Sequence, residues 1–264
     1  MTAKAAPARG LSASERRLSV DDRPSLRGAK VRLMRAVARH MELQALEHEG
    51  KTDPQPIRLT ADRAEWEVGE PLRPTIDWSQ ARPIDVTHAK LLTSEIVQHL
   101  RAALDYLAYN LVWLDTSPPD RGRERFIHFP VVRNEARWKT EANGRLPGVT
   151  REHLAIIREY QPFAGCSWTA TLADLAMIDR HRFVLDIFRE YSGTFSNNRE
   201  TVSVDPVNST QAVVDVGRLD FRFMLPDEQP AVETLATLSR EAALLVWRLQ
   251  GDFGEHDELT ITPQ

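Results

Sequence analysis

The chain has 264 residues, a net charge of −4 and 42% hydrophobic residues, values typical of a soluble globular protein with one large or two small domains. Its single cysteine, Cys166, excludes an internal disulfide and a cysteine-based zinc cluster, and it favours a reducing compartment. No apolar run near Met1 resembles the hydrophobic region of a signal peptide, so we expect a cytoplasmic protein with no membrane span.

Charge is unevenly distributed along the chain. Residues 1–40 carry ten Lys or Arg against three Asp or Glu, whereas residues 225–264 carry two against eight. The basic end could attract phosphate groups or an acidic partner, although two oppositely charged ends can also attract each other. We therefore predict at most weak binding to nucleic acid, and we keep a homodimer formed through the helices as a hypothesis.

The first forty residues contain an arm and a helix. Residues 1–24 mix Ala, Pro, Ser and charge without periodicity, which predicts a disordered arm. Ser25 is placed to cap a helix over residues 26–49, which ends at Gly50. We expect the apolar side of this helix to consist of Val31, Met34, Val37, Met41, Leu43 and Leu46.

The central stretch of the chain is residues 91–114, which have the longest helical periodicity and a cap at Asp85 or Thr87. Past Ala102 the apolar surface covers almost the whole circumference, as in a helix that is wrapped by other elements. We therefore expect this helix to be the centre of the core.

The proline-rich stretch before that helix contains two short alternating segments, 57–61 and 64–68, which predict a hairpin. After the central helix, residues 116–149 look irregular except for a brief buried extended piece at 126–132. Thr150 is positioned to cap a short helix over residues 151–160.

The last third of the chain changes period twice. A second long helix is predicted for residues 169–191, and residues 200–225 alternate with a period of two, which predicts two or three antiparallel strands. An amphipathic helix over 229–250 precedes an acidic tail, residues 251–264. The prediction is a mainly α, α+β fold, with a bundle of three to four helices and a small antiparallel sheet in one domain, residues 25–250.

Charged residues on the two long helices form the main candidate site. Arg101 and Asp105 are four residues apart and share one face of the central helix, while Asp179, His181 and Arg182 lie in the second long helix. Buried ions have to be paired. We therefore predict a charge network between the helices, with Arg101 paired to Asp179 and Asp105 to Arg182 or His181. Asp179→Asn should then cost about 3 kcal/mol or more.

The same five residues are the candidates for catalysis. His181 could act as a general acid or base, oriented by Asp105 or Asp179, while Arg101 and Arg182 bind an anion. Two classes of function therefore remain open. One is a non-catalytic binding or assembly protein with a buried charge network between helices, and the other is an enzyme that acts on RNA.

Several blocks of the sequence resemble those of a known family. The blocks are Leu100-Arg-Ala-Ala-Leu-Asp-Tyr-Leu107, Phe129-Pro130, Tyr160-Gln-Pro-Phe163 and Ile178-Asp-Arg-His-Arg182. In this order they resemble the LRxALDxL, FP, QPY and IDxHR blocks of an uncharacterised bacterial family. The chain departs from that pattern by Phe163 in place of Tyr and by Arg180 in place of Lys. The resemblance implies no activity, because none is assigned to the family.

The chain is also similar in one motif to HEPN domains, helical bundles of which many members are metal-independent ribonucleases with an Arg-x4–6-His motif. Arg35 and His40 have that spacing, but the polar residue that often follows the arginine is absent. The resemblance implies a ribonuclease that uses His181 with Arg101 or Arg182 across helices. Glycine-rich nucleotide loops and Glu-x-x-His pairs are absent from the sequence, so no cofactor or metal is predicted.

Overall fold

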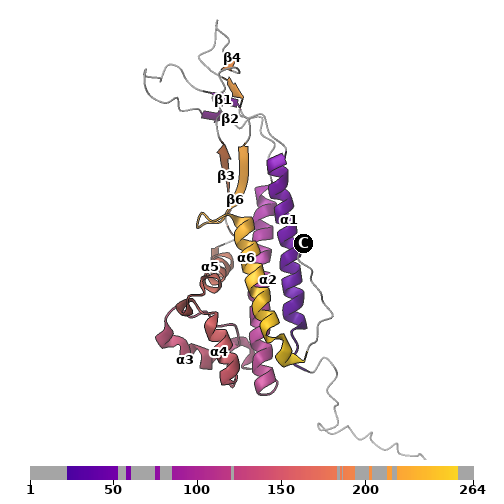
Figure 1. The fold of residues 1–264 in the computed structure, drawn as a ribbon, viewed down its shortest axis with the longest axis vertical. Coiled ribbons are helices and arrows are strands. Elements are labelled where there is room, and N and C mark those ends of the chain that lie inside the picture. Colours follow the sequence, from indigo (N-terminus) through magenta and orange to yellow (C-terminus); the bar gives the residue numbers. More distant parts are fainter. Residues whose placement is uncertain are drawn as a thin grey trace, which may run out of the picture.

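The structure is a computed structural model that describes residues 23–52, 58–60, 75–77, 85–119, 122–182, 185, 187–193, 202–203, 213–215 and 219–254. Its α-helices are α1 (Arg27–Thr52), α2 (Val86–Asp115), α3 (Trp138–Arg145), α4 (Arg151–Glu159), α5 (Ser167–Arg182) and α6 (Ala231–Gln250). Figure 1 shows α1, α2 and α6 side by side along the long axis, with α3, α4 and α5 on one side of them. The prediction of a mainly α protein is confirmed.

Helix α2 is the central helix of this arrangement, because it packs against α1, α5 and α6. Asp85 caps it by accepting a hydrogen bond of 2.9 Å from the backbone N–H of His88, so one of the two predicted caps is confirmed. Its buried residues continue to Leu111 and Val112, near its end. In the second half of α2, where we expected other elements to cover the apolar side chains, Tyr106 differs because it remains 42% exposed.

The predicted apolar side of α1 is confirmed at Leu43 and Leu46, which pack in the core, and was wrong at its other four residues. Val31, Met34, Val37 and Met41 are exposed, and the buried stripe consists instead of Leu26, Ala29, Leu33, Ala36 and Leu43. The two alanines and the neighbouring Gly28 let α2 and α6 approach the backbone of α1 closely, which longer side chains would prevent. A helix can therefore bury its smaller residues and leave its methionines in contact with solvent.

The segment between α2 and α4 is more ordered than the irregular loop that we predicted. It includes α3 and the 3-10 turns η4 (Glu124–Phe126) and η5 (Glu135–Arg137). Within the extended piece, Ile127, Phe129 and Val132 are buried. Thr150 caps α4 through a bond from the N–H of His153, so the short fourth helix and its cap are confirmed.

The second long helix is shorter than predicted. Helix α5 ends at Arg182, and β3 (Phe188–Gly193) replaces the expected last turns. Strand β3 pairs antiparallel with β6 (Leu219–Met224), from Phe188 opposite Met224 to Gly193 opposite Leu219. Aromatic residues favour a pleated surface when a partner strand is available, and here the paired residues lie between 26 (Gly193 and Leu219) and 36 (Phe188 and Met224) positions apart in the chain.

The remaining strands are β1 (Arg58–Thr60), β2 (Thr75–Asp77), β4 (Val202–Ser203) and β5 (Val213–Asp215), in the order β2-β1-β5-β4. Strand β1 has β2 on one side and β5 on the other. Both of its edges are therefore occupied, and the predicted hairpin of 57–61 with 64–68 was wrong. Residues 64–68 themselves lie outside the described residues, as does the predicted arm up to residue 22.

Helix α6 is confirmed, and the chain remains packed just beyond it. The 3-10 turn η7 (Gly251–Phe253) follows directly, and Phe253 packs against the core. Nε2 of His153 lies 3.4 Å from the Asp252 carboxylate, and Nδ1 lies 2.8 Å from Asp115. The described start of the predicted acidic tail is thus anchored to α4 through His153 and to the core through Phe253. None of the helices in the described ranges is both long and apolar enough to cross a membrane.

Candidate functional site

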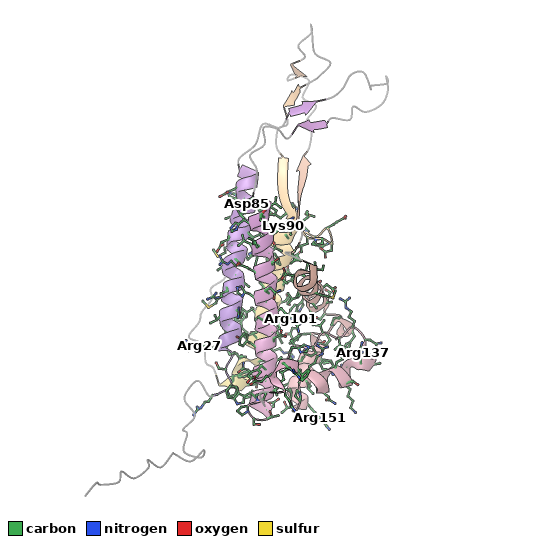
Figure 2. The ribbon with its side chains drawn as sticks, turned by 180° about the vertical axis from the view of Figure 1, so that it is seen from behind. Arg27, Asp85, Lys90, Arg101, Arg137 and Arg151 are labelled. Atoms are coloured by element: carbon green, nitrogen blue, oxygen red, sulfur yellow. The ribbon has the colours of Figure 1, made fainter. Side chains whose placement is uncertain are left out.

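Arg101 and Asp105 bind the backbone of one residue, Phe129. They form an ion pair of 3.0 Å within α2, and Arg101 lies about halfway along that helix (Figure 2). The guanidinium of Arg101 donates a 2.9 Å hydrogen bond to the Phe129 carbonyl, and the Phe129 N–H donates one of 2.9 Å to Oδ1 of Asp105. The predicted pairing of Arg101 with Asp179 was therefore wrong, whereas the predicted pairing of Asp105 with Arg182 or His181 involves side chains outside the described residues. A peptide group from the extended segment satisfies both charges instead.

Asp179 does lie against α2, but its partner there is neutral. The side-chain amide of Gln98 donates a hydrogen bond to the Asp179 carboxylate, at an exposed position. The side chains of His181 and Arg182 lie outside the described residues. The structure therefore does not bring the five predicted site residues together in its described part, although α2 and α5 are neighbours as expected.

A second polar side chain, Gln161, holds the same extended segment and was missed as a structural residue. It is fully buried, accepts a 2.9 Å bond from the Val132 N–H and donates a 3.0 Å bond to the Ile157 carbonyl. Its side-chain amide offers both a hydrogen-bond donor and an acceptor, so it can satisfy a buried backbone carbonyl and a buried backbone N–H at the same time. The signal in the sequence was a glutamine directly before Pro162 at a helix end, within one of the recurring blocks.

His128 lies between these contacts, half-buried. Burial and then the positive charges of Arg145 and Arg101 lower the pKa of His128, against an opposing effect of Asp105. Its Nε2 contacts the guanidinium of Arg145, which also pairs with Glu141 at 2.9 Å. When a neutral imidazole accepts a hydrogen bond from an arginine, its basic nitrogen is not available to take a proton from a substrate. This cluster is therefore best explained as support for the extended segment.

The Arg-x4-His motif does not form a joint site. His40 makes a 2.8 Å hydrogen bond to the Val232 carbonyl at the start of α6, whereas Arg35 lines a pocket beside α2. Cys166 is also unsuited to nucleophilic attack, because burial raises the pKa of its thiol. Within the described ranges, no group of His, Cys, Asp or Glu side chains is arranged to hold a metal ion.

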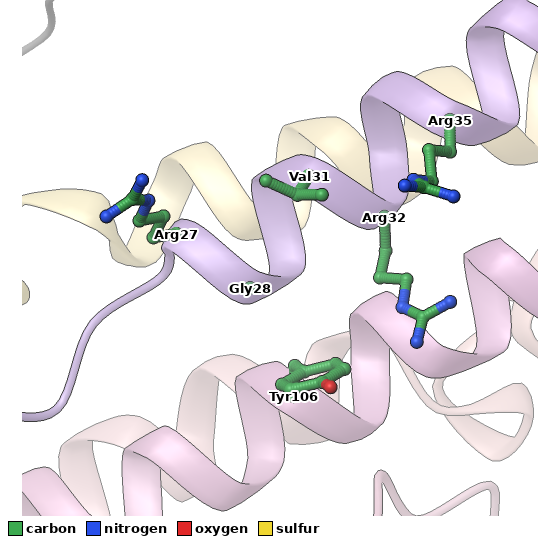
Figure 3. Close-up of a pocket in the computed structure, with 6 residues that line it drawn as sticks. All are labelled: Arg27, Gly28, Val31, Arg32, Arg35 and Tyr106. Carbon is green, nitrogen blue, oxygen red and sulfur yellow. The ribbon is translucent and has the colours of Figure 1, made fainter. Parts of the chain in front are cut away.

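The pocket beside Arg35 lies between α1 and α2 and has a volume of about 470 Å³ (Figure 3). We call it the arginine pocket. Its lining consists of Arg27, Gly28, Val31, Arg32, Arg35 and Tyr106. The sequence indicated only a basic first third, because the arginines of α1 and the tyrosine of α2 are about seventy positions apart and meet only in the folded chain.

Tyr106 forms one wall of the arginine pocket because the residue opposite it is glycine. A Cβ atom on Gly28 would lie 2.9 Å from Cδ1 of Tyr106, too close for the ring to keep its place. The guanidinium of Arg32 lies 5.8 Å from the centroid of that ring, within the range of a cation–π contact. The aromatic wall and one cation are thus held together before any ligand is bound.

The electrostatics of the arginine pocket are strongly positive. In the described part of the chain, Arg27, Arg32 and Arg35 have no carboxylate within ion-pair distance. Nη1 of Arg32 instead lies 3.3 Å from Nδ1 of His99, and the pKa of His99 is lowered by burial and then by Arg32 and Arg35. At His99 the effect of these positive charges outweighs the opposing effect of the Glu95 carboxylate.

The chain matches no family model, and neither a curated protein nor a solved structure is significantly similar to it. The two resemblances noted from the sequence remain hypotheses.

Proposed function

We propose that this protein is a non-catalytic binding module and that its arginine pocket holds a small anion carrying phosphate groups. The observation that carries the proposal is the set of three arginines, without a described carboxylate partner, around one pocket. Like charges held close together repel one another, and a bound anion removes that repulsion. Guanidinium groups suit phosphate in particular, because they donate two parallel hydrogen bonds to its oxygens.

The extent of the positive charge supports a compact ligand. One turn beyond Arg35, Arg39 is neutralised by Glu42 at 2.8 Å and by Glu95 at 2.6 Å. The positive end of the α1 dipole adds to the field at Arg27, where the helix begins. A volume of about 470 Å³ is that of a small-molecule site. A pyrophosphate group matches this short patch better than a long nucleic-acid backbone does.

The non-catalytic part of the proposal is supported by the contacts of Arg101 and Asp105, which are both engaged by the Phe129 backbone. A bundle of three to four helices beside a small antiparallel sheet, in the cytoplasm, is the setting that we propose for the module. The packing of α1 and α6 against α2, and the pairing of β3 with β6, support that architecture.

The test is calorimetric titration of the full chain with inorganic pyrophosphate. We expect binding that weakens at higher salt, and a loss of about tenfold or more in affinity for each of Arg32→Gln and Arg35→Gln, since a charge-assisted hydrogen bond contributes about 1.5–3 kcal/mol. The matched control is Arg125→Gln, which removes the same single charge at an exposed position elsewhere on the surface. No binding by the unaltered chain, or an equal loss in the control, would overturn the proposal.

The ribonuclease alternative requires a separate assay. RNA is incubated with the unaltered chain and with His181→Ala, without added metal. We expect no cleavage by either protein. Cleavage that His181→Ala abolishes would replace the binding module by the HEPN-like enzyme.

A further inference from the structure

Helix α1 carries two heptad series, and only one of them is used within the described fold. The inward-facing series has steps of three and four residues and consists of Leu26, Ala29, Leu33, Ala36, His40, Leu43 and Glu47, all of them buried except His40, which is partly buried. A second series with the same steps lies on another face and consists of Val31, Met34, Ala38, Met41 and Ala45, all of them exposed. Alternating steps of three and four define the seam of a coiled coil.

The exposure of this second series, which we call the outer seam, is large. Val31 is 44% exposed, Met34 47% and Met41 64%. Val37, beside the seam, is 44% exposed. Single exposed apolar residues are ordinary on a protein surface, but a continuous stripe over four turns of one helix indicates an interaction surface.

We propose that the outer seam pairs with the outer seam of a second copy of this chain, with the two α1 helices antiparallel. The seam is nearly symmetric about Ala38: Val31 and Ala45 lie seven residues before and after it, and Met34 and Met41 lie four before and three after. A two-fold axis through Ala38 therefore places Val31 of one copy opposite Ala45 of the other, and Met34 within one position of Met41. It also places the smallest side chain where the two helices cross, which allows close approach.

Charge at the ends of the seam decides between the two orientations. Arg27 lies eleven residues before Ala38 and Glu49 lies eleven residues after it, and both are exposed. In the antiparallel pair, Arg27 of each copy faces Glu49 of the other. A parallel pair would place Arg27 opposite Arg27 and Glu49 opposite Glu49, which is unfavourable. This inference goes beyond the proposed function, because it requires no anion in the arginine pocket. The two surfaces share Arg27 and Val31, so pairing of Arg27 with Glu49 leaves Arg32 and Arg35 to bind the anion.

The first experiment measures the mass of the full chain by sedimentation equilibrium over a range of concentrations. We expect a concentration-dependent dimer that Met34→Glu with Met41→Glu converts to a monomer. Met177→Glu is the control, because Met177 is 57% exposed on α5, away from the seam. A chain that stays monomeric, or a dimer that the seam variant leaves intact, would contradict the proposal.

The second experiment tests the orientation with a short bismaleimide cross-linker in a Cys166→Ser background. Ala38→Cys should cross-link between copies, because Ala38 lies on the axis. Ala45→Cys should not, because seven residues on each side of the axis separate the two thiols by about 21 Å along the helices. Equal cross-linking at both positions would show a parallel pair and overturn the antiparallel arrangement.

A charge exchange completes the test of the pairing. Glu49→Arg should weaken the dimer by bringing like charges together, and adding Arg27→Glu should restore it. Restoration in the double variant is specific to the antiparallel contact. A double variant that is weaker than either single variant would speak against it.

Discussion

Asp105→Ala is the substitution that best tests how the centre of this fold is held. It removes the carboxylate that accepts the Phe129 N–H at 2.9 Å and pairs with Arg101 at 3.0 Å. Phe129 is fully buried, so water replaces the lost acceptor poorly, and an unsatisfied buried group costs about 1–3 kcal/mol. Arg101 loses its ion pair with Asp105 but keeps its hydrogen bond to the Phe129 carbonyl. The lost ion pair therefore adds only about 1 kcal/mol. We expect the free energy of unfolding to fall by about 2–4 kcal/mol.

Two further variants make the measurement specific. Asp105→Asn keeps an oxygen acceptor and should cost less than Asp105→Ala. Asp179→Asn should change the free energy of unfolding by less than about 0.5 kcal/mol, because Asp179 accepts its bond from Gln98 at an exposed position. Urea unfolding followed by circular dichroism measures all three, with an unchanged slope as the check of two-state behaviour.

This reasoning would be refuted if the substitution at Asp179 destabilised the protein more than the substitution at Asp105. If Asp179→Asn costs about 3 kcal/mol while Asp105→Ala costs almost nothing, the charge network between helices predicted from the sequence is present after all. The bonds to the Phe129 backbone would then contribute little to stability.

Three other predictions follow from single features of the chain. The pKa of His128 is lowered by burial and by Arg145, so the unfolded chain binds a proton at higher pH than the folded chain does. The free energy of unfolding should therefore decrease as the pH falls below about 6.5, and His128→Gln should reduce this dependence in urea unfolding; an unchanged slope would contradict it. Cys166, whose thiol pKa is raised by burial, should react with iodoacetamide at neutral pH more slowly than free cysteine, and equal rates would show an activated thiol. A chain that starts at Arg23 should keep its thermal midpoint within about 2 °C, whereas a much larger fall would show that the first residues are packed.

The hydrogen bonds also give a structural meaning to the sequence blocks. The Arg101–Asp105 pair of the first block binds the backbone of Phe129, which opens the second block. Gln161 of the third block binds the backbone at Val132, three residues further on. The first and third blocks thus hold one buried extended segment, which begins with the second block. Their residue types follow from the backbone groups that they satisfy and require no catalytic role.

The sequence by itself determined the features that depend on neighbours in the chain. The periodicity of α2 and α6, and the caps at Asp85 and Thr150, are set by contacts within one or two helical turns. Mainly helical structure follows from the same local preferences. For this reason four helices were predicted close to their observed positions.

Only the tertiary structure decided which surfaces meet. Helix α1 offers two heptad series, and periodicity does not show which of them faces α2 and α6. Residues 188–193 suit a helix as well as a strand until β6 presents an edge to them. Arg101 has the same charge whether its partner is Asp179 or a peptide group, and the choice depends on where the segment around Phe129 is placed. Each of these outcomes depends on groups far apart in sequence, whose approach is set by packing rather than by local preference.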